Sequence, residues 1–125
     1  MERSITNALS ATLLLSVASS ASLAQTAPPT YEGDPAVYKV IFEDQNFRVI
    51  TGTWKKGEHD KNHSHPVPSI VYSLTDCVIR IHMPDGKTRD VTDKAGGAQA
   101  VPITQSHTAE NIGPGDCQLV FVERK

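Results

Sequence analysis

Short runs of β-branched and aromatic residues recur along the chain from Val37 onward, and polar turn-forming residues separate them. The runs have the length and composition of β-strands, and none repeats apolar residues at the spacing of a helix. We predict strands at 37–42, 47–54, 69–74, 77–83, 88–91, 98–101, 105–111 and 117–122. Many short strands, spaced by roughly 8 to 12 residues, predict an all-β fold, either a sandwich or a barrel.

The first two dozen residues differ in composition from the rest of the chain. Arg3 is the only cation among them, and residues 8–24 carry no charge and consist mainly of alanine, leucine and serine. Their apolar core is too short to span a membrane, and Ser22 and Ala24 supply the small residues that a cleavage site needs. We predict a signal peptide at 1–24 and a mature chain that is periplasmic or secreted and free of the membrane. An amphipathic N-terminal helix is the alternative, which this uncharged pattern disfavours.

The segment that follows, residues 25–36, contains three prolines and one glycine but few apolar residues. This composition predicts an extended linker. Residues 37–125 then form one domain, because a chain of 125 residues that loses its N-terminal segment has no room for a second. The net charge of −2 comes from interspersed acidic and basic residues without a cationic cluster, so we expect no nucleic-acid partner.

Three of the five histidines form a candidate metal site. His63 and His65 are separated by one residue, so in a strand both imidazoles point to the same face. His107 lies in another predicted strand, on a face that it shares with Gln105. Imidazoles bind first-row divalent ions, and three protein ligands leave coordination positions open for water or substrate. The pattern therefore predicts one divalent transition metal, with Fe, Zn, Mn, Ni and Cu as candidates.

The other two histidines fit this site less well. Within 77–83, apolar residues alternate with Arg80 and His82, which places His82 on the solvent side of its strand. His59 lies between two acidic neighbours in a charged loop, where a solvated surface histidine is the more common case. We assign neither residue a role from the sequence.

The chain resembles the cupin family in two motifs. The first cupin motif runs Gly, five residues, His-x-His, three or four residues, Glu, six residues and Gly. The second runs Gly, five residues, Pro-x-Gly, two residues, His, three residues and Asn. The positions of this chain that match, in order and spacing, are Gly57, His63, His65, Gly96, Pro102, His107 and Asn111. The resemblance begins at about Val37 and implies a cupin-type double-stranded β-helix, a jelly-roll barrel, in which the three histidines are the metal ligands.

Three positions depart from the cupin motifs. Asp76 and Thr104 stand where the motifs have glycine, which a turn tolerates if φ is negative or, for aspartate, left-handed. Ser69 stands where the first motif has its glutamate. Without that carboxylate the protein ligands leave the double charge of the ion uncompensated, which favours a bound hydroxide or an anionic substrate.

The resemblance also points to residues that would contact a small-molecule ligand or substrate. If Ser69 takes the inward position of the motif glutamate, Val71 and Ser73 face inward as well, because side chains alternate along a strand. Gln105, on the face of His107, is the fourth candidate for substrate binding.

Cys77 and Cys117 are the only cysteines of the chain. A jelly roll would place the strand that ends near Asp76 beside the last strand, and this would bring the two cysteines close. Export would add an oxidising compartment, in which a disulfide persists. Two buried thiols that act as small apolar side chains are the alternative.

The resemblance leaves the activity open. Cupins with three-histidine sites include dioxygenases of small thiols and diketones, so a metal-dependent oxygenase or related enzyme is one hypothesis. A cupin that binds a metal or small ligand without turnover is the second, and a domain that has lost its chemistry is the third. Cupins commonly pair through strand edges, which makes a homodimer the candidate assembly.

Overall fold

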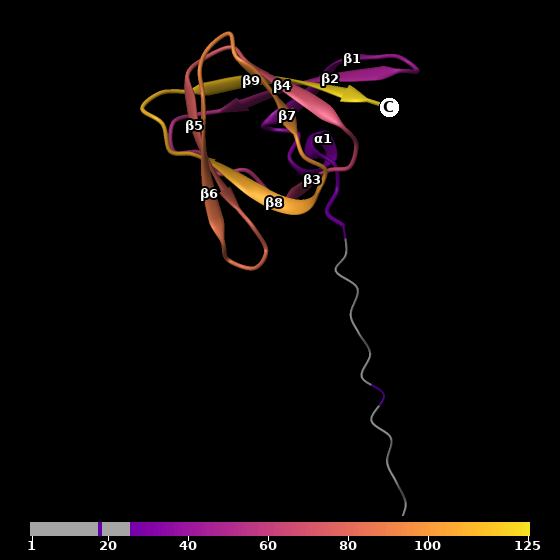
Figure 1. Cartoon of the computed structure of the whole chain (residues 1–125), viewed down its shortest axis with the longest axis horizontal. Helices are drawn as coiled ribbons and strands as arrows, with labels where there is room; N and C mark the ends of the chain where they lie inside the picture. The colour runs from indigo at the N-terminus through magenta and orange to yellow at the C-terminus, as the bar shows by residue number, and fades with distance from the viewer. Residues whose placement is uncertain (1–17, 19–25) are drawn as a thin grey trace, which may run out of the picture.

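Two antiparallel sheets face each other in the computed structural model, which describes residues 18 and 26–125 (Figure 1). The five-stranded sheet has the order β1 (Tyr38–Glu43), β2 (Phe47–Trp54), β9 (Cys117–Arg124), β4 (Ser69–Ser73) and β7 (Ala98–Val101). The four-stranded sheet has the order β3 (His63–His65), β8 (Thr104–Asn111), β5 (Cys77–His82) and β6 (Thr88–Asp93). This arrangement confirms the predicted all-β jelly roll.

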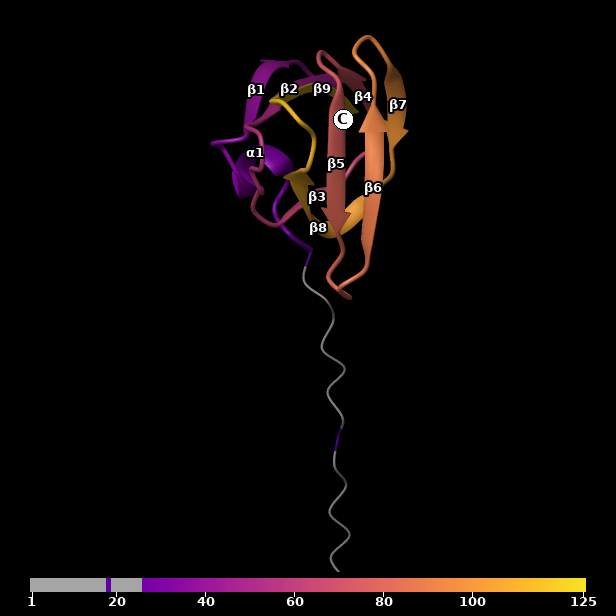
Figure 2. The ribbon, with the colours of Figure 1, turned by 90° about the vertical axis from the view of Figure 1, so that its left-hand side faces the viewer.

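The strands follow the alternation that the sequence predicts. In β4 the burial pattern alternates between buried and exposed residues, and in β8 and β9 every second side chain is buried along most of the strand. Each buried set faces the opposite sheet, so the core forms between the two layers, around Tyr38, Ile50, Trp54 and Phe121. Figure 2 shows β5 and β6 side by side along the barrel, where they pair over their whole length.

Among the described residues, β3 is the one strand that the hydrophobic pattern does not reveal. It consists of His63, Ser64 and His65, all buried, so it has neither apolar residues nor alternation. Its backbone pairs with β8 on one side, and Ser64 donates its backbone N–H to the carbonyl of Pro28 at 2.8 Å. Backbone pairing, rather than side-chain composition, makes this segment a strand.

Residues 26–36 differ from the expected extended linker, because they pack against the barrel. Ala27 donates its backbone N–H to the carbonyl of Gln105 at 3.0 Å, and a helical turn, α1, spans Thr30–Gly33. Asp34 is buried and accepts a hydrogen bond from the backbone N–H of Lys61 at 3.0 Å. The linker prediction rests on the small number of apolar side chains in this segment. Amino-acid composition does not reveal backbone hydrogen bonds such as these. Apart from Ala18, the predicted signal peptide at 1–24 lies outside the described residues.

The turns of the two cupin-like motifs have the backbone that glycine favours. Gly57 and Gly96, which open the two motifs, have φ values of 77° and 83°. Among the described residues, only glycines have a positive φ. Asp76 and Thr104 therefore replace the motif glycines without left-handed backbone strain.

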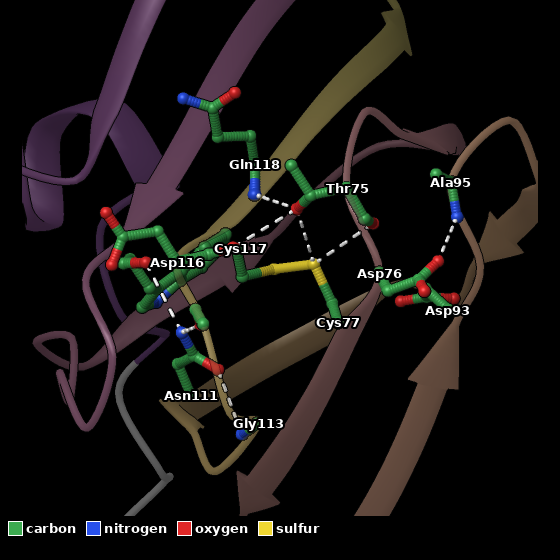
Figure 3. The surroundings of a disulfide bond; sticks show 12 residues. Thr75, Asp76, Cys77, Asp93, Ala95, Asn111, Gly113, Asp116, Cys117 and Gln118 are labelled. Atoms are coloured by element: carbon green, nitrogen blue, oxygen red, sulfur yellow. Dashed lines mark hydrogen bonds between the residues drawn. A yellow bond between two sulfur atoms is a disulfide. The ribbon is translucent and has the colours of Figure 1, made fainter.

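A disulfide bond joins Cys77 at the start of β5 to Cys117 at the start of β9, with Cα atoms 5.2 Å apart (Figure 3). The strands β4 and β9 are antiparallel neighbours, as the jelly-roll order implied. Because β5 and β9 belong to different sheets, the disulfide links the two layers at one end of the barrel. Thr75 lies beside it and accepts a hydrogen bond of 2.9 Å from the backbone N–H of Gln118.

In the part of the chain that the structure describes, no helix has both the length and the apolar character needed to cross a membrane.

Candidate metal centre

His63, His65 and His107 converge in the interior of the barrel. The first two come from β3 and the third from β8, and the antiparallel register places His63 directly opposite His107. The exposed fractions of the three residues are 0%, 4% and 8%. One ring nitrogen of each lies within 4.8 Å of the corresponding atoms of the other two, so the three rings can share one ion.

The closest approach in the cluster is between two ring nitrogens. The Nε2 atoms of His63 and His107 are 2.9 Å apart, and the hydroxyl oxygen of Tyr38 lies 3.2 Å from the Nε2 atom of His63. With metal–nitrogen distances of about 2.05 Å, two ligands at a right angle are separated by about 2.9 Å, and two at a tetrahedral angle by about 3.3 Å. The observed separation therefore suits a shared metal ion.

Hydrogen bonds around the cluster determine which atoms carry lone pairs. The Nδ1 atom of His63 lies 2.9 Å from the carbonyl oxygen of Lys61. A carbonyl can only accept, so Nδ1 carries a proton and Nε2 can present its lone pair to the cluster. The hydroxyl of Tyr38 donates to Asp60 at 2.7 Å, so its oxygen also directs a lone pair at His63. A bound metal ion, or a proton on the Nε2 atom of His107, would lie between the Nε2 atoms of His63 and His107.

Burial keeps two of the imidazoles neutral. It lowers the pKa of His65 to about 4, with a further contribution from the charge of His63. Burial also lowers the pKa of His107 to about 3, and the charges of His63, His65 and Arg89 lower it further. Neutral imidazole is the form that binds metals, so both rings are available as ligands at neutral pH.

Asp60 is a buried carboxylate beside His63, and the sequence alone did not identify it. Its carboxylate accepts hydrogen bonds from Tyr38, from the indole N–H of Trp54 at 3.2 Å and from the backbone N–H of Ala109 at 2.6 Å. One carboxylate oxygen lies 3.6 Å from the Nδ1 atom of His63. Burial raises the pKa of Asp60, and the charge of His63 and these donors oppose the rise. The partners lie 22, 6 and 49 residues away, so no local motif connects them.

A cavity of about 430 Å³ adjoins the three histidines. Its wall is mainly apolar and includes Val71, Ile79, Leu119 and Phe121. Lys87 and Arg89 also line it, and both remain exposed to solvent. The alternation of side chains along β6 could have predicted that Arg89 lines the cavity, because Arg89 lies two positions from Val91, which points inward.

The four residues expected to contact a ligand have different positions. Val71 lines the cavity, whereas Ser69 and Ser73 are buried in the same strand without lining it. The hydroxyl oxygen of Ser69 is buried and has no hydrogen-bond partner among the described residues. Gln105 is exposed and lies outside the cavity, which corrects the expectation for this residue. The register of β8 against β3 shifts between the pairs His63–His107 and His65–Thr104, so the alternation is interrupted at this end of β8 and Thr104 lines the cavity instead.

Asn111, the last residue of the second motif, has a structural role. Its side-chain amide donates to the carbonyls of Trp54, Lys55 and Gly115. Its oxygen accepts the backbone N–H of Gly113 (Figure 3). These bonds tie the turn between β8 and β9 to the end of β2.

No family model matches the sequence, and no curated protein matches it. Solved structures match its fold. A cupin domain from Bordetella pertussis Tohama I has a TM-score of 0.65 and 18% identity, over 78% of this chain and 96% of that chain. A cupin family protein with a double-stranded β-helix fold from Methanocaldococcus jannaschii has a TM-score of 0.57 and 14% identity, over 70% and 78%.

A cupin superfamily protein from Desulfitobacterium hafniense DCB-2 has a TM-score of 0.51 and 11% identity, over 70% of this chain and 75% of that chain. At identities this low the likeness concerns the fold and not the activity. The order of the strands, the two facing sheets and these neighbours agree, so the chain folds as a small cupin, a double-stranded β-helix.

Proposed function

We propose that this protein binds one divalent transition metal through His63, His65 and His107, and that a small anionic molecule binds beside the metal in the cavity. The observation that carries the proposal is the convergence of three buried imidazoles at the wall of an apolar cavity. When bound, the ion would act as a Lewis acid toward an oxygen atom of that molecule. Imidazole ligands suit Fe, Zn, Ni and Cu, and Mn remains a candidate.

The charge of the cavity lining supports an anionic ligand, because Lys87 and Arg89 outnumber Asp93 there. The three imidazoles contribute no negative charge, and Asp60 is held by three hydrogen-bond donors behind the cluster. Arg89 adds a positive charge close enough to His107 to lower its pKa. A divalent ion would therefore keep most of its charge, which a carboxylate can neutralise, while the apolar wall accommodates an organic group.

Two forms of this function differ in whether turnover follows binding. Three protein ligands leave coordination positions free, which supports a metal-dependent oxygenase or related enzyme. The proton of the Tyr38 hydroxyl is directed to Asp60 and not into the cavity. This second observation favours a cupin that binds a metal and a small molecule without turnover.

Metal analysis of protein purified without a histidine tag tests the proposal. The wild type should bind one more ion per chain than His107→Gln, and the neighbouring variant Ser106→Ala should match the wild type. Equal metal contents of wild type and His107→Gln under metal-replete conditions would sink the idea. Oxygen uptake with a panel of small carboxylic acids and thiols then separates catalysis from binding alone.

We also propose that the protein is exported to the periplasm or beyond. The disulfide between Cys77 and Cys117 supports this, since such bonds persist in oxidising compartments. The composition of residues 1–24 supports it as well. N-terminal sequencing of the protein from a periplasmic or culture fraction should begin at Gln25.

The homodimer stays a prediction, which light scattering coupled to size-exclusion chromatography tests.

A further inference from the structure

A second group of potential metal ligands lies on the outer surface of the four-stranded sheet. It comprises His59, His82 and Glu110, whose ligand atoms all lie within 4.8 Å of one another. His59 is exposed, and the other two residues are half-buried. The group is therefore accessible from solvent, whereas the interior cluster is reached through the cavity.

Strand parity places two of these side chains on the outer face. In β8 the buried residues His107, Ala109 and Asn111 alternate with outward residues that include Glu110. The register between β5 and β8 pairs His82 with Thr108, so His82 is the diagonal neighbour of Glu110. Side chains at such positions on one face of a sheet can reach each other.

Backbone hydrogen bonds hold His59 beside Glu110. The two residues form an isolated antiparallel bridge. On one side of it Asp60 donates its N–H to the carbonyl of Ala109 at 2.9 Å, and on the other Asn111 donates its N–H to the carbonyl of Glu58 at 2.9 Å. The position of His59 relative to β8 is thus set by the backbone and does not depend on a bound ion.

The tautomer of His59 suits metal binding. Its Nδ1 atom lies 3.0 Å from the carbonyl oxygen of Asp60, so this nitrogen carries the proton. The Nε2 atom then presents its lone pair, with the hydroxyl of Thr108 at 3.5 Å. A hydrogen bond from the distal nitrogen to a backbone carbonyl is the usual way in which a metal-binding histidine is oriented.

The carboxylate of Glu110 is already directed at His82. One of its oxygens lies 2.9 Å from the Nε2 atom of His82. Arg80, which lies opposite Glu110 in the register, instead forms two hydrogen bonds with Asp90, at 2.8 and 3.1 Å. Because Arg80 is paired with Asp90, the carboxylate of Glu110 stays directed at His82.

We propose that His59, His82 and Glu110 form a second metal site, which binds Zn²⁺ or a similar divalent ion independently of the interior site. Two imidazoles and one carboxylate form a ligand set that borderline divalent ions accept, with a fourth position left to water. The carboxylate offsets half of the charge of the ion, which no ligand of the interior cluster does. The ion would replace the proton that His82 shares with Glu110.

Zinc titration of the full protein without a histidine tag, in competition with a chromophoric chelator, tests this site. The background is the variant His65→Gln, in which the interior cluster is incomplete. In that background one Zn²⁺ should still bind, and His59→Gln or Glu110→Gln should each weaken it at least about tenfold. Asp85→Asn, which removes an exposed carboxylate from the turn between β5 and β6 outside the group, should leave the affinity unchanged.

Electron paramagnetic resonance of bound Cu²⁺ identifies the ligands directly. In the His65→Gln background the spectrum should show coupling to two imidazole nitrogens, and His59→Gln should reduce the number to one. His59 is exposed, so this variant should keep the circular dichroism spectrum of its parent. The proposal is overturned if zinc affinity is the same with and without His59 and Glu110. If the interior site alone fails to bind zinc, the proposed function is contradicted and the second site is not.

Discussion

Tyr38 and Asp60 are joined by a hydrogen bond of 2.7 Å inside the barrel, where their exposed fractions are 2% and 3%. The same carboxylate accepts the indole N–H of Trp54 and the backbone N–H of Ala109. The oxygen of Tyr38 in turn lies 3.2 Å from the Nε2 atom of His63. One buried carboxylate therefore connects both sheets to a ligand of the candidate metal centre.

Replacement of Asp60 by alanine should destabilise the protein strongly. The variant leaves three buried donors without an acceptor, and an unsatisfied buried donor costs about 1–3 kcal/mol. We expect the free energy of unfolding in urea to fall by at least about 3 kcal/mol. The exposed Asp90→Ala should change it by less than about 1 kcal/mol. A loss for Asp60→Ala no larger than that of the control would contradict this account.

Restoration of the motif glutamate should strengthen metal binding. Ser69 is buried and takes the position of the glutamate in the first cupin motif, so Ser69→Glu would bring an anionic group toward the three imidazoles. We expect the metal-free variant to unfold at a lower temperature than the wild type, because the carboxylate is buried without a partner. Zinc should raise its melting temperature by more than it raises that of the wild type. Equal shifts in calorimetry would show that residue 69 does not reach the metal.

The metal-free protein should lose stability as the pH falls from 6.5. The pKa of His65 is lowered from 6.5 to about 4 and that of His107 to about 3, so between these values the unfolded chain binds more protons than the folded one. Their contribution to stability is complete above pH 6.5 and decreases toward pH 4, by about 1 kcal/mol per pH unit for each ring.

Urea unfolding in the presence of a chelator measures this slope. His65→Gln cannot titrate at this position, so its stability should change less steeply over the same range. Identical slopes for the variant and the wild type would rule out the buried neutral histidine as the cause.

Arg89 should contribute to the binding of anions. Benzoate is a suitable probe because it combines a carboxylate with an apolar ring that suits the cavity wall. In calorimetric titration of the zinc-loaded protein, Arg89→Gln should weaken benzoate binding by at least about tenfold, in line with a charge-assisted hydrogen bond worth about 1.5–3 kcal/mol. Lys39→Gln, which removes an exposed charge from β1, should bind benzoate as the wild type does. Equal affinities for the two variants would place the anion elsewhere.

The disulfide should account for a measurable part of the stability. It closes a loop between residues 40 positions apart, which in the chain-entropy model stabilises the fold by roughly 3–4 kcal/mol. We expect the double variant Cys77→Ala/Cys117→Ala to unfold at lower urea concentration than the oxidised protein. Reduction of the wild type should lower the midpoint by a similar amount. If the variant is as stable as the oxidised wild type, the cross-link makes no net contribution.

Local patterns allowed the fold and the location of the candidate metal centre to be predicted. Alternation along strands such as 69–74 identifies the face that is buried, since side chains of a strand point to opposite sides in turn. The spacing of His63, His65 and His107 within two motifs was sufficient to select them over the other histidines. These features depend on neighbours in the sequence, so they are visible without coordinates.

The tertiary structure decided which distant residues meet. The register of β8 against its neighbours brings Glu110 to His59 and His82, and the packing of the two sheets brings Tyr38 and Trp54 to Asp60. The docking of residues 26–36 and the exposure of Gln105 were also beyond the local pattern. Such contacts are set by strand order, register and the depth of the barrel. Alternation predicts which side of a strand a residue faces, but not what it meets there.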